Sequence, residues 1–172
     1  MKTLLCIVLC SYVLVQAGLV LALFSAQMAL GAIGWTGLME AAADGNLTAV
    51  MALVDSGADV ADGGKPEMPP LLCAAMKNNL AVVSYLSDIA DVNQAGQNGV
   101  RAIYMAATRG HLEAVQLLAE KGADVDRADK DGNTPALLAA AEGNLAMLQL
   151  LSDNGAGTLI VARRATRPNA PT

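Results

Sequence analysis

Apolar side chains recur at spacings of three and four residues along much of the chain, in short runs that glycine interrupts. Leu145, Leu148 and Leu151 form one such run, which Gly143 and Gly155 bound. This spacing places apolar side chains on one face of an α-helix, and a glycine just past such a run is a common helix stop. The pattern therefore predicts short amphipathic helices and indicates an all-α fold.

An Ala-Ala pair marks each of four copies of this pattern. The pairs begin at Ala41, Ala74, Ala106 and Ala139, so the copies are 33, 32 and 33 residues apart. Self-similarity at such a period is the signature of a repeat architecture, in which each unit packs only on its neighbours. Small side chains let helices approach closely, and we therefore expect the alanine pairs at the contacts between stacked units.

Local signals divide each unit into a turn, a first helix, a second helix and a loop. In the fourth copy Thr134 is suited to cap a helix, Pro135 to its first turn, and Asn144 to cap a second helix. Asp131 and Gly132 form a turn signal ahead of them. In the third copy we expect four residues to form the inner face of the second helix: Leu112, Val115, Leu117 and Leu118.

The start of the chain is a different kind of segment, because no charged side chain occurs between Lys2 and Glu40. An apolar run of this length exceeds the about 20 residues that span a bilayer. It begins like a secretory signal peptide, with Lys2, an apolar stretch and a small-residue cleavage site that ends at Ala17. We expect residues 1–33 to be a signal peptide or an uncleaved signal-anchor transmembrane segment. The alternative is an apolar helix that caps the repeats of a cytosolic protein.

The charges on either side of this run predict the orientation of the chain. Lys2 precedes the run, and the first charged residues beyond it are acidic. Positive charge stays on the cytoplasmic side of a membrane. The repeats are therefore expected on the exoplasmic side, in a protein that is secreted, periplasmic or membrane-anchored.

The charge of the repeats makes nucleic acid a poor candidate for their partner. All 16 acidic side chains but only 7 of the 11 basic ones lie between residues 34 and 162, because Lys2, Arg163, Arg164 and Arg167 lie outside this range. A phosphate-binding surface needs clustered lysine and arginine, which the repeats lack. The three arginines near the C-terminus form a basic tail, residues 163–172, which we expect to be disordered and solvated.

The inventory of reactive side chains offers little for catalysis or metal binding. His111 is the only histidine, and Cys73 is the only cysteine beyond the apolar run. A Cys-His dyad is thus the one nucleophilic pair available, and the chain lacks the ligands of a four-coordinate metal site. The alternating aspartates from Asp124 to Asp131 do not follow the calcium-loop pattern, since its twelfth position is Pro135. The sequence predicts no enzyme, no cofactor, no metal site and no small-molecule substrate.

Three stretches strongly resemble ankyrin repeats, and the resemblance covers about residues 34–159. They read LMEAAADGNLTAVMALVDSGADV from Leu38, IYMAATRGHLEAVQLLAEKGADVD from Ile103, and TPALLAAAEGNLAMLQLL from Thr134. The period matches the ankyrin unit. The resemblance implies a four-repeat ankyrin solenoid at residues 34–162, with repeats at about 34–61, 62–93, 94–126 and 127–159. It also implies a non-catalytic module that binds another protein of unknown identity.

Two departures from the ankyrin pattern are relevant to stability. The histidine of the usual Thr-Pro-Leu-His start is absent from every copy, and its place is taken by Met39, Leu72, Tyr104 and Leu137. In the family this histidine links a repeat to its neighbour, so we expect weaker coupling between units. The second copy is also one residue shorter, near Ser87 to Ala90, which makes it the expected weak point.

The resemblance also implies where a partner binds, at the loops between repeats and at the exposed end of each first helix. Met68, Met76 and Val100 would then be exposed apolar residues within a polar rim, an arrangement typical of protein interfaces. The alternative is that these three side chains pack against neighbouring loops. The residues implied are Lys65, Glu67, Met68, Met76, Lys77, Gln97, Asn98, Val100, Thr108, Arg109, Lys130, Asp131, Asn133, Ala141 and Glu142.

Overall fold

The computed structural model describes residues 36–64 and 67–157, which form four pairs of antiparallel helices and contain no strand. The predicted N-terminal segment 1–33 and the tail 163–172 lie outside these residues. Within the described ranges no helix has the length and hydropathy that crossing a bilayer requires. The pairs are α2 (Gly37–Asp44) with α3 (Leu47–Asp55), α4 (Pro70–Met76) with α5 (Leu80–Ile89), α6 (Ala102–Thr108) with α7 (Leu112–Glu120), and α8 (Pro135–Ala141) with α9 (Leu145–Asp153).

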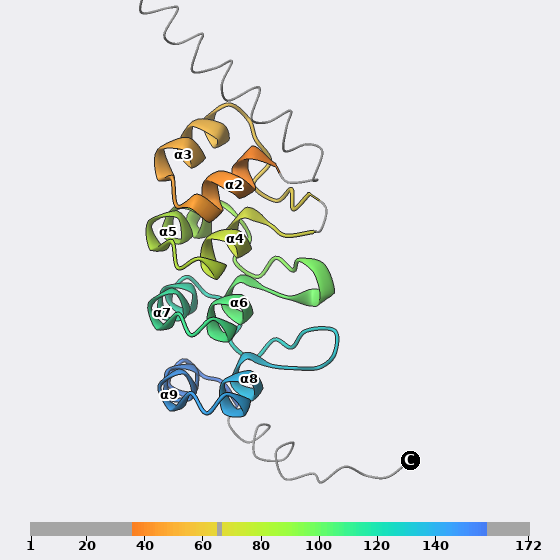
Figure 1. The fold of residues 1–172 in the computed structure, drawn as a ribbon, viewed down its shortest axis with the longest axis vertical. Coiled ribbons are helices and arrows are strands. Elements are labelled where there is room, and N and C mark those ends of the chain that lie inside the picture. The colour runs from red at the N-terminus through yellow and green to blue at the C-terminus, as the bar shows by residue number, and fades with distance from the viewer. Residues whose placement is uncertain (1–35, 65–66, 158–172) are drawn as a thin grey trace, which may run out of the picture.

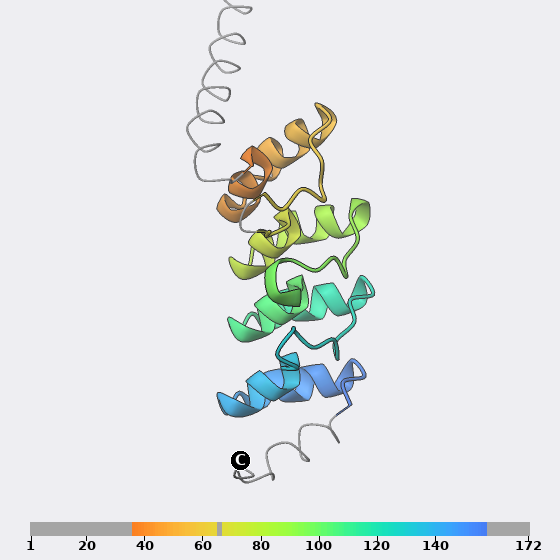
Figure 2. The same ribbon diagram turned by 90° about the vertical axis from the view of Figure 1, so that its right-hand side faces the viewer.

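The four pairs stack into a solenoid (Figure 1). The first helices α2, α4, α6 and α8 form one column and the second helices α3, α5, α7 and α9 form another. The loops that connect successive pairs extend away from the helices, on the side of the first helices. Figure 2 views the stack from this side and shows the units repeating one below another.

The core follows the contact lines between the stacked units. Ala74, Ala75 and Ala106 are fully buried, which confirms the prediction that the alanine pairs lie between units. Larger side chains such as Ile103 and Leu86 are buried in the same core. Because alanine offers little bulk, neighbouring first helices lie close together, and a leucine at these positions would overpack the stack.

The predicted caps begin the helices as expected. The Thr134 side chain accepts a hydrogen bond from the Leu137 amide, and Asn144 accepts one from Met147. Between the paired helices the backbone must adopt a positive φ, which glycine does without strain, as at Gly143. In the second unit Asn78 takes this place with φ 59°, and its buried Oδ1 atom has no hydrogen-bond partner. The second unit therefore carries a local strain that its glycine-bearing counterparts avoid.

The shorter second unit also ends differently. Helix α5 continues to Ile89, and Ala90 then leaves it in an extended conformation. In the third unit Gly122 stands at this exit with φ 88°. The second unit is one residue shorter than the third because its chain leaves the helix directly, without the left-handed glycine turn.

The apolar face of each second helix differs in part from the prediction. Leu151 is fully buried as expected, but Met147 is buried beside it, whereas Leu145 is 77% exposed and Leu148 is half-buried. Each step of three residues falls about 60° short of a full turn, so a strict three-residue spacing drifts off the buried face. In α7, Leu112 and Leu117 are only half-buried, whereas Ala114, Val115 and Leu118 are fully buried.

Replacing Leu118 with alanine should lower the free energy of unfolding by about 2 to 5 kcal/mol, because it removes a fully buried side chain. Leu117→Ala should cost about 1 kcal/mol, since that side chain is half-buried. Denaturant unfolding of both variants measures the difference. Equal losses at the two positions would contradict the assigned face of α7.

Candidate partner-binding surface

The connecting loops end in three fingers, at the described residues 61–64 and 67–69, 94–101, and 127–134. Main-chain hydrogen bonds join each finger to the next. The Gln97 amide donates to the Glu67 carbonyl oxygen at 2.6 Å, and the Lys130 amide donates to that of Asn98 at 2.9 Å. Each finger also closes on itself, for example through the Gly96 amide and the Val100 carbonyl at 2.8 Å. The fingers therefore form a continuous, hydrogen-bonded edge of the solenoid.

Close approach of the backbone explains the glycines in these fingers. A Cβ atom on Gly96 would lie 2.8 Å from the Glu67 carbonyl oxygen, and one on Gly63 would lie 2.7 Å from the Met68 nitrogen. A side chain at Gly96 would push the second finger away from the first, and one at Gly63 would distort the first finger itself. Glycine is needed here for space, since neither residue has a positive φ.

Tyr104 occupies the place of the missing histidine in the third unit, and it still links two units. Its hydroxyl donates a hydrogen bond of 2.8 Å to Asp129 Oδ2 in the third finger. The other oxygen of Asp129 accepts bonds from the amides of Asn133 and Asp131, which holds the finger turn in shape. A side-chain link between units is therefore present at this position, and weaker coupling than in an array with the histidine stays a prediction.

The charges at this contact alter two pKa values. Burial, the hydrogen bond to Asp129 and the negative charge of that carboxylate raise the pKa of Tyr104 to about 12. Desolvation by itself raises the pKa of Asp129, but hydrogen bonds from Asn133, Tyr104 and Asp131 outweigh it and lower that pKa below its ordinary value. At neutral pH the contact joins a neutral phenol to a carboxylate.

A second set of links joins the turns between the paired helices of the second and third units to the unit before each. Asn79 Nδ2 donates to the carbonyl oxygens of Ala42 and Ala43 in the last turn of α2, both at 2.8 Å. His111 Nε2 lies 3.1 Å from the carbonyl oxygen of Met76 at the end of α4, and a carbonyl can only accept. These side chains bond to carbonyl groups in the last turn of a first helix, where the helix itself provides fewer donors. Sequence reasoning assigned neither role.

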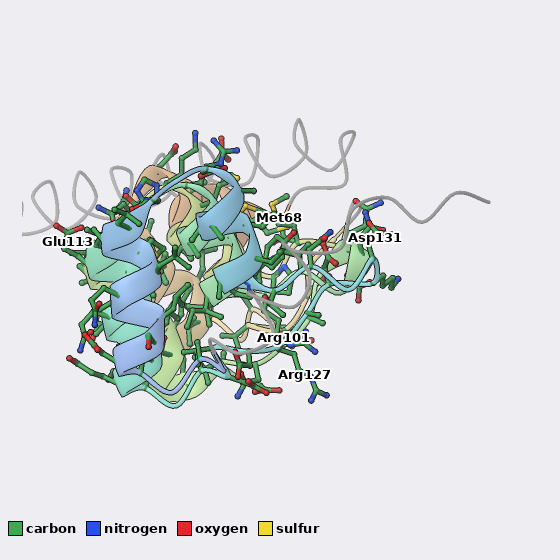
Figure 3. The ribbon with its side chains drawn as sticks, turned by 90° about the horizontal axis from the view of Figure 1, so that it is seen from below. Met68, Arg101, Glu113, Arg127 and Asp131 are labelled. Atoms are coloured by element: carbon green, nitrogen blue, oxygen red, sulfur yellow. The ribbon has the colours of Figure 1, made fainter. Side chains whose placement is uncertain are left out.

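Arg101 is a further link that sequence reasoning missed. Its guanidinium donates to the carbonyl oxygens of Asn93 at 3.1 Å and Gly99 at 3.0 Å, and reaches that of Ala128 in the next finger at 3.5 Å. Figure 3 shows Arg101 and Arg127 together on one side of the fingers, away from Met68. The only available signal was an arginine in place of the threonine that begins an ankyrin unit.

Most of the residues implied for partner binding lie on the finger tips and on the neighbouring ends of the first helices. In Figure 3, Met68 lies in the angle between the helices and the fingers, Asp131 lies at a finger tip, and Glu113 lies on the opposite side of the stack. Lys65 falls outside the described residues. The exposed members are Glu67, Lys77, Gln97, Asn98, Arg109, Lys130, Asp131, Ala141 and Glu142, and the half-buried ones are Met68, Met76, Val100, Thr108 and Asn133.

The three apolar members are less exposed than the sequence suggested. Met68 and Val100 pack against the core, and Met76 is half-buried at the end of α4. Thr108 and Asn133 have local partners, the carbonyl oxygen of Tyr104 and the carboxylate of Asp129. The alternative of packing against neighbouring elements thus applies in part, and the polar finger tips form the more accessible part of the surface.

The geometry separates the one pair of groups considered for nucleophilic catalysis. Burial raises the pKa of Cys73 to about 11, so that its thiol stays protonated at neutral pH. Its sulfur faces the Met68 carbonyl ahead of α4, whereas His111 binds the Met76 carbonyl at the other end of that helix. Among the described residues, no three His, Cys, Asp or Glu side chains are grouped so that they could hold a metal ion.

Comparison with known families gives one match, to a family description of ankyrin repeats in three copies. It covers residues 11–96 and 71–160, which overlap and together span most of the chain. No curated protein matches the chain significantly. The match agrees with the helical stack, and the family consists of interaction domains that are generally non-catalytic.

Removing the Tyr104 hydroxyl should destabilise the fold by about 1 kcal/mol at neutral pH, because it breaks the bond to Asp129. The tyrosine pKa is raised in the folded state, so this contribution is present below pH 10 and lost as the pH rises towards 12. Denaturant unfolding of Tyr104→Phe at neutral pH and above pH 10 measures both effects. Tyr85→Phe is the control, since the Tyr85 hydroxyl has no hydrogen bond within the described residues; equal losses in the two variants would contradict the assignment.

Proposed function

The chain belongs to the ankyrin repeat family, and from this premise we propose that all four helix pairs are ankyrin repeats that bind a protein partner in the angle between the first helices and the fingers. The observation that carries this proposal is the row of exposed polar tips on a hydrogen-bonded edge, formed by residues such as Gln97, Asn98, Lys130 and Asp131. Binding is favoured when the binding groups are already held in place, because less conformational freedom is lost.

The composition of this surface supports a protein as the partner. Met68, Met76 and Val100 are half-buried apolar side chains of this surface, and the charged side chains of Lys77 and Arg109 are exposed at the ends of α4 and α6. A half-buried apolar centre with a polar rim is typical of protein interfaces. Methionine adapts to partners of irregular shape because its side chain is unbranched and flexible.

Charge reversal at this surface should strongly weaken binding to a partner recovered with the intact chain. Arg109→Glu and Lys77→Glu change exposed side chains, and Met76→Asp places a charge at one of the half-buried apolar positions. We expect the affinity to fall about tenfold or more. A reversed charge repels the partner group that it previously attracted, and a new charge at an apolar position loses its hydration when the partner binds. Affinity measurements by calorimetry or surface plasmon resonance provide the readout.

Glu113→Arg and Glu120→Arg are the matched controls, since both residues are exposed on the second-helix side. Melting curves of all five variants should stay near that of the parent chain, as expected for surface substitutions. If Met76→Asp alone lowers the melting temperature, Arg109→Glu and Lys77→Glu still test the proposed face. Normal binding by the Arg109 and Lys77 variants, with loss at Glu113 or Glu120, would overturn the proposed face.

We also propose that the repeats act on the exoplasmic side of a membrane, after export that the N-terminal segment directs. The support is the uncharged sequence between Lys2 and Glu40, with a signal-like cleavage site at Ala17. Cleavage after Ala17 or retention as an anchor are both compatible with this support. The second candidate function is a cytosolic ankyrin adaptor whose apolar segment caps the repeats.

Intact-mass measurement of the protein from fractionated cells separates these proposals. Export with cleavage predicts a chain that begins at Gly18 in the secreted or periplasmic fraction, and a retained anchor predicts the full chain in the membrane fraction. Recovery of the uncleaved chain in the cytosolic fraction would refute export and support the adaptor.

A further inference from the structure

The side of the stack opposite the fingers carries a groove that neither the fold nor the proposed binding face uses. It lies between α7 and α9 and has a volume of about 660 Å³. The half-buried side chains of Leu112, Leu117 and Leu150 form its apolar floor. A groove of this size falls within the range of sites that bury a ligand or a short peptide segment, about 300 to 1,000 Å³.

Carboxylates surround this floor. Glu113 lies toward one end of the groove, and Glu120 and Asp153 lie at the other, since they are the last residues of α7 and α9. Gln116 donates to Glu120 at 2.7 Å and Gln149 donates to Asp153 at 2.8 Å, which orients both carboxylates. None of the three forms an ion pair with a described residue. The groove is therefore suited to a segment that combines apolar and cationic side chains.

We propose that the C-terminal segment of the same chain, residues 158–172, occupies this groove. The segment contains Leu159, Ile160 and Val161, followed by Arg163, Arg164 and Arg167, and it has no acidic side chain. Its composition thus complements both the leucine floor and the carboxylates. The repeats themselves offer no comparable cluster of cations, because their 7 basic side chains are spread over residues 34–162.

The length of the segment permits this docking. It begins directly after Gly157, four residues beyond the Asp153 carboxylate at the near end of the groove. An extended chain covers about 3.3 Å per residue, so Arg163 can lie up to about 20 Å from Gly157 and thus return to Asp153 and Glu120.

The spacing of the charges also agrees. Glu113 and Glu120 are seven residues apart on one helix, which corresponds to about 10 Å. Arg164 and Arg167 are three residues apart, which also corresponds to about 10 Å in an extended chain. One arginine can therefore approach each end of the groove while the alkyl parts of the arginines cover leucine. We expect residues 163–172 to be disordered when they are free in solution. Under this proposal the segment becomes ordered when it binds the groove.

The test is limited trypsin digestion of the full-length chain, with mass spectrometry following cleavage after Arg163 and Arg164. A docked tail resists cleavage. Neutralising the groove with Glu113→Gln and Glu120→Gln adds no cleavage site and should accelerate loss of the tail about fivefold, as two exposed ion pairs allow. Asp44→Asn with Asp55→Asn removes the same charge from exposed positions of the first unit and should leave the rate unchanged.

Equal cleavage rates in the parent chain and the groove variant would overturn the proposal. Protection that disappears on dilution would also overturn it, because the occupant would then be the tail of a second copy. Hydrogen exchange provides an independent measurement. Arg163→Gln, Arg164→Gln and Arg167→Gln together should increase exchange in α7 and α9 of the full-length chain, and unchanged exchange there would refute docking.

Discussion

The close approach of neighbouring first helices is the constraint on which this structure depends. Ala74, Ala75 and Ala106 are fully buried along these contacts, and their small side chains set the distance between units. The links at the two ends of each unit work only at this distance. They are the main-chain bond between Gln97 and Glu67 in the fingers and the bonds of Asn79 to the carbonyl groups of α2. A larger side chain at the alanine positions would strain all of these links together.

Local signals predicted the start and end of the helices well. Thr134 and Asn144 cap helices as their residue types indicate, because capping depends only on the next few residues. The buried face was predicted less well. Leu145 fits an apolar pattern yet is exposed, while Met147 is buried, since helical rotation and the position of the neighbouring unit decide burial together. The spacing of apolar residues in the sequence reports helical rotation, but it does not report the position of the neighbouring unit.

The links between units lay beyond prediction for a different reason. Tyr104 and Asp129 are 25 residues apart, and Asn79 and Ala42 are 37 residues apart, so only the stacked geometry brings these groups together. The loss of the family's histidine also gave no indication that Tyr104, Asn79 and His111 would link the units through other atoms. The candidate binding residues were placed on the fingers by resemblance, but the half-burial of Met68 and Val100 required the folded chain.

The bonds that join the fingers have a consequence for how binding specificity can change. The donors at Gln97 and Lys130 are main-chain amides, and the acceptors at Glu67 and Asn98 are main-chain carbonyls. The side chains at these tips therefore take no part in holding the fingers together. Many residues can replace Glu67, Gln97 and Lys130 without loosening the edge, except proline at the two donor positions, because it has no amide hydrogen. Asn98 is more restricted, since its φ of 61° is a left-handed conformation that asparagine and glycine adopt most readily. Mutation can thus diversify the proposed binding surface while selection for stability acts on the alanines and glycines beneath it.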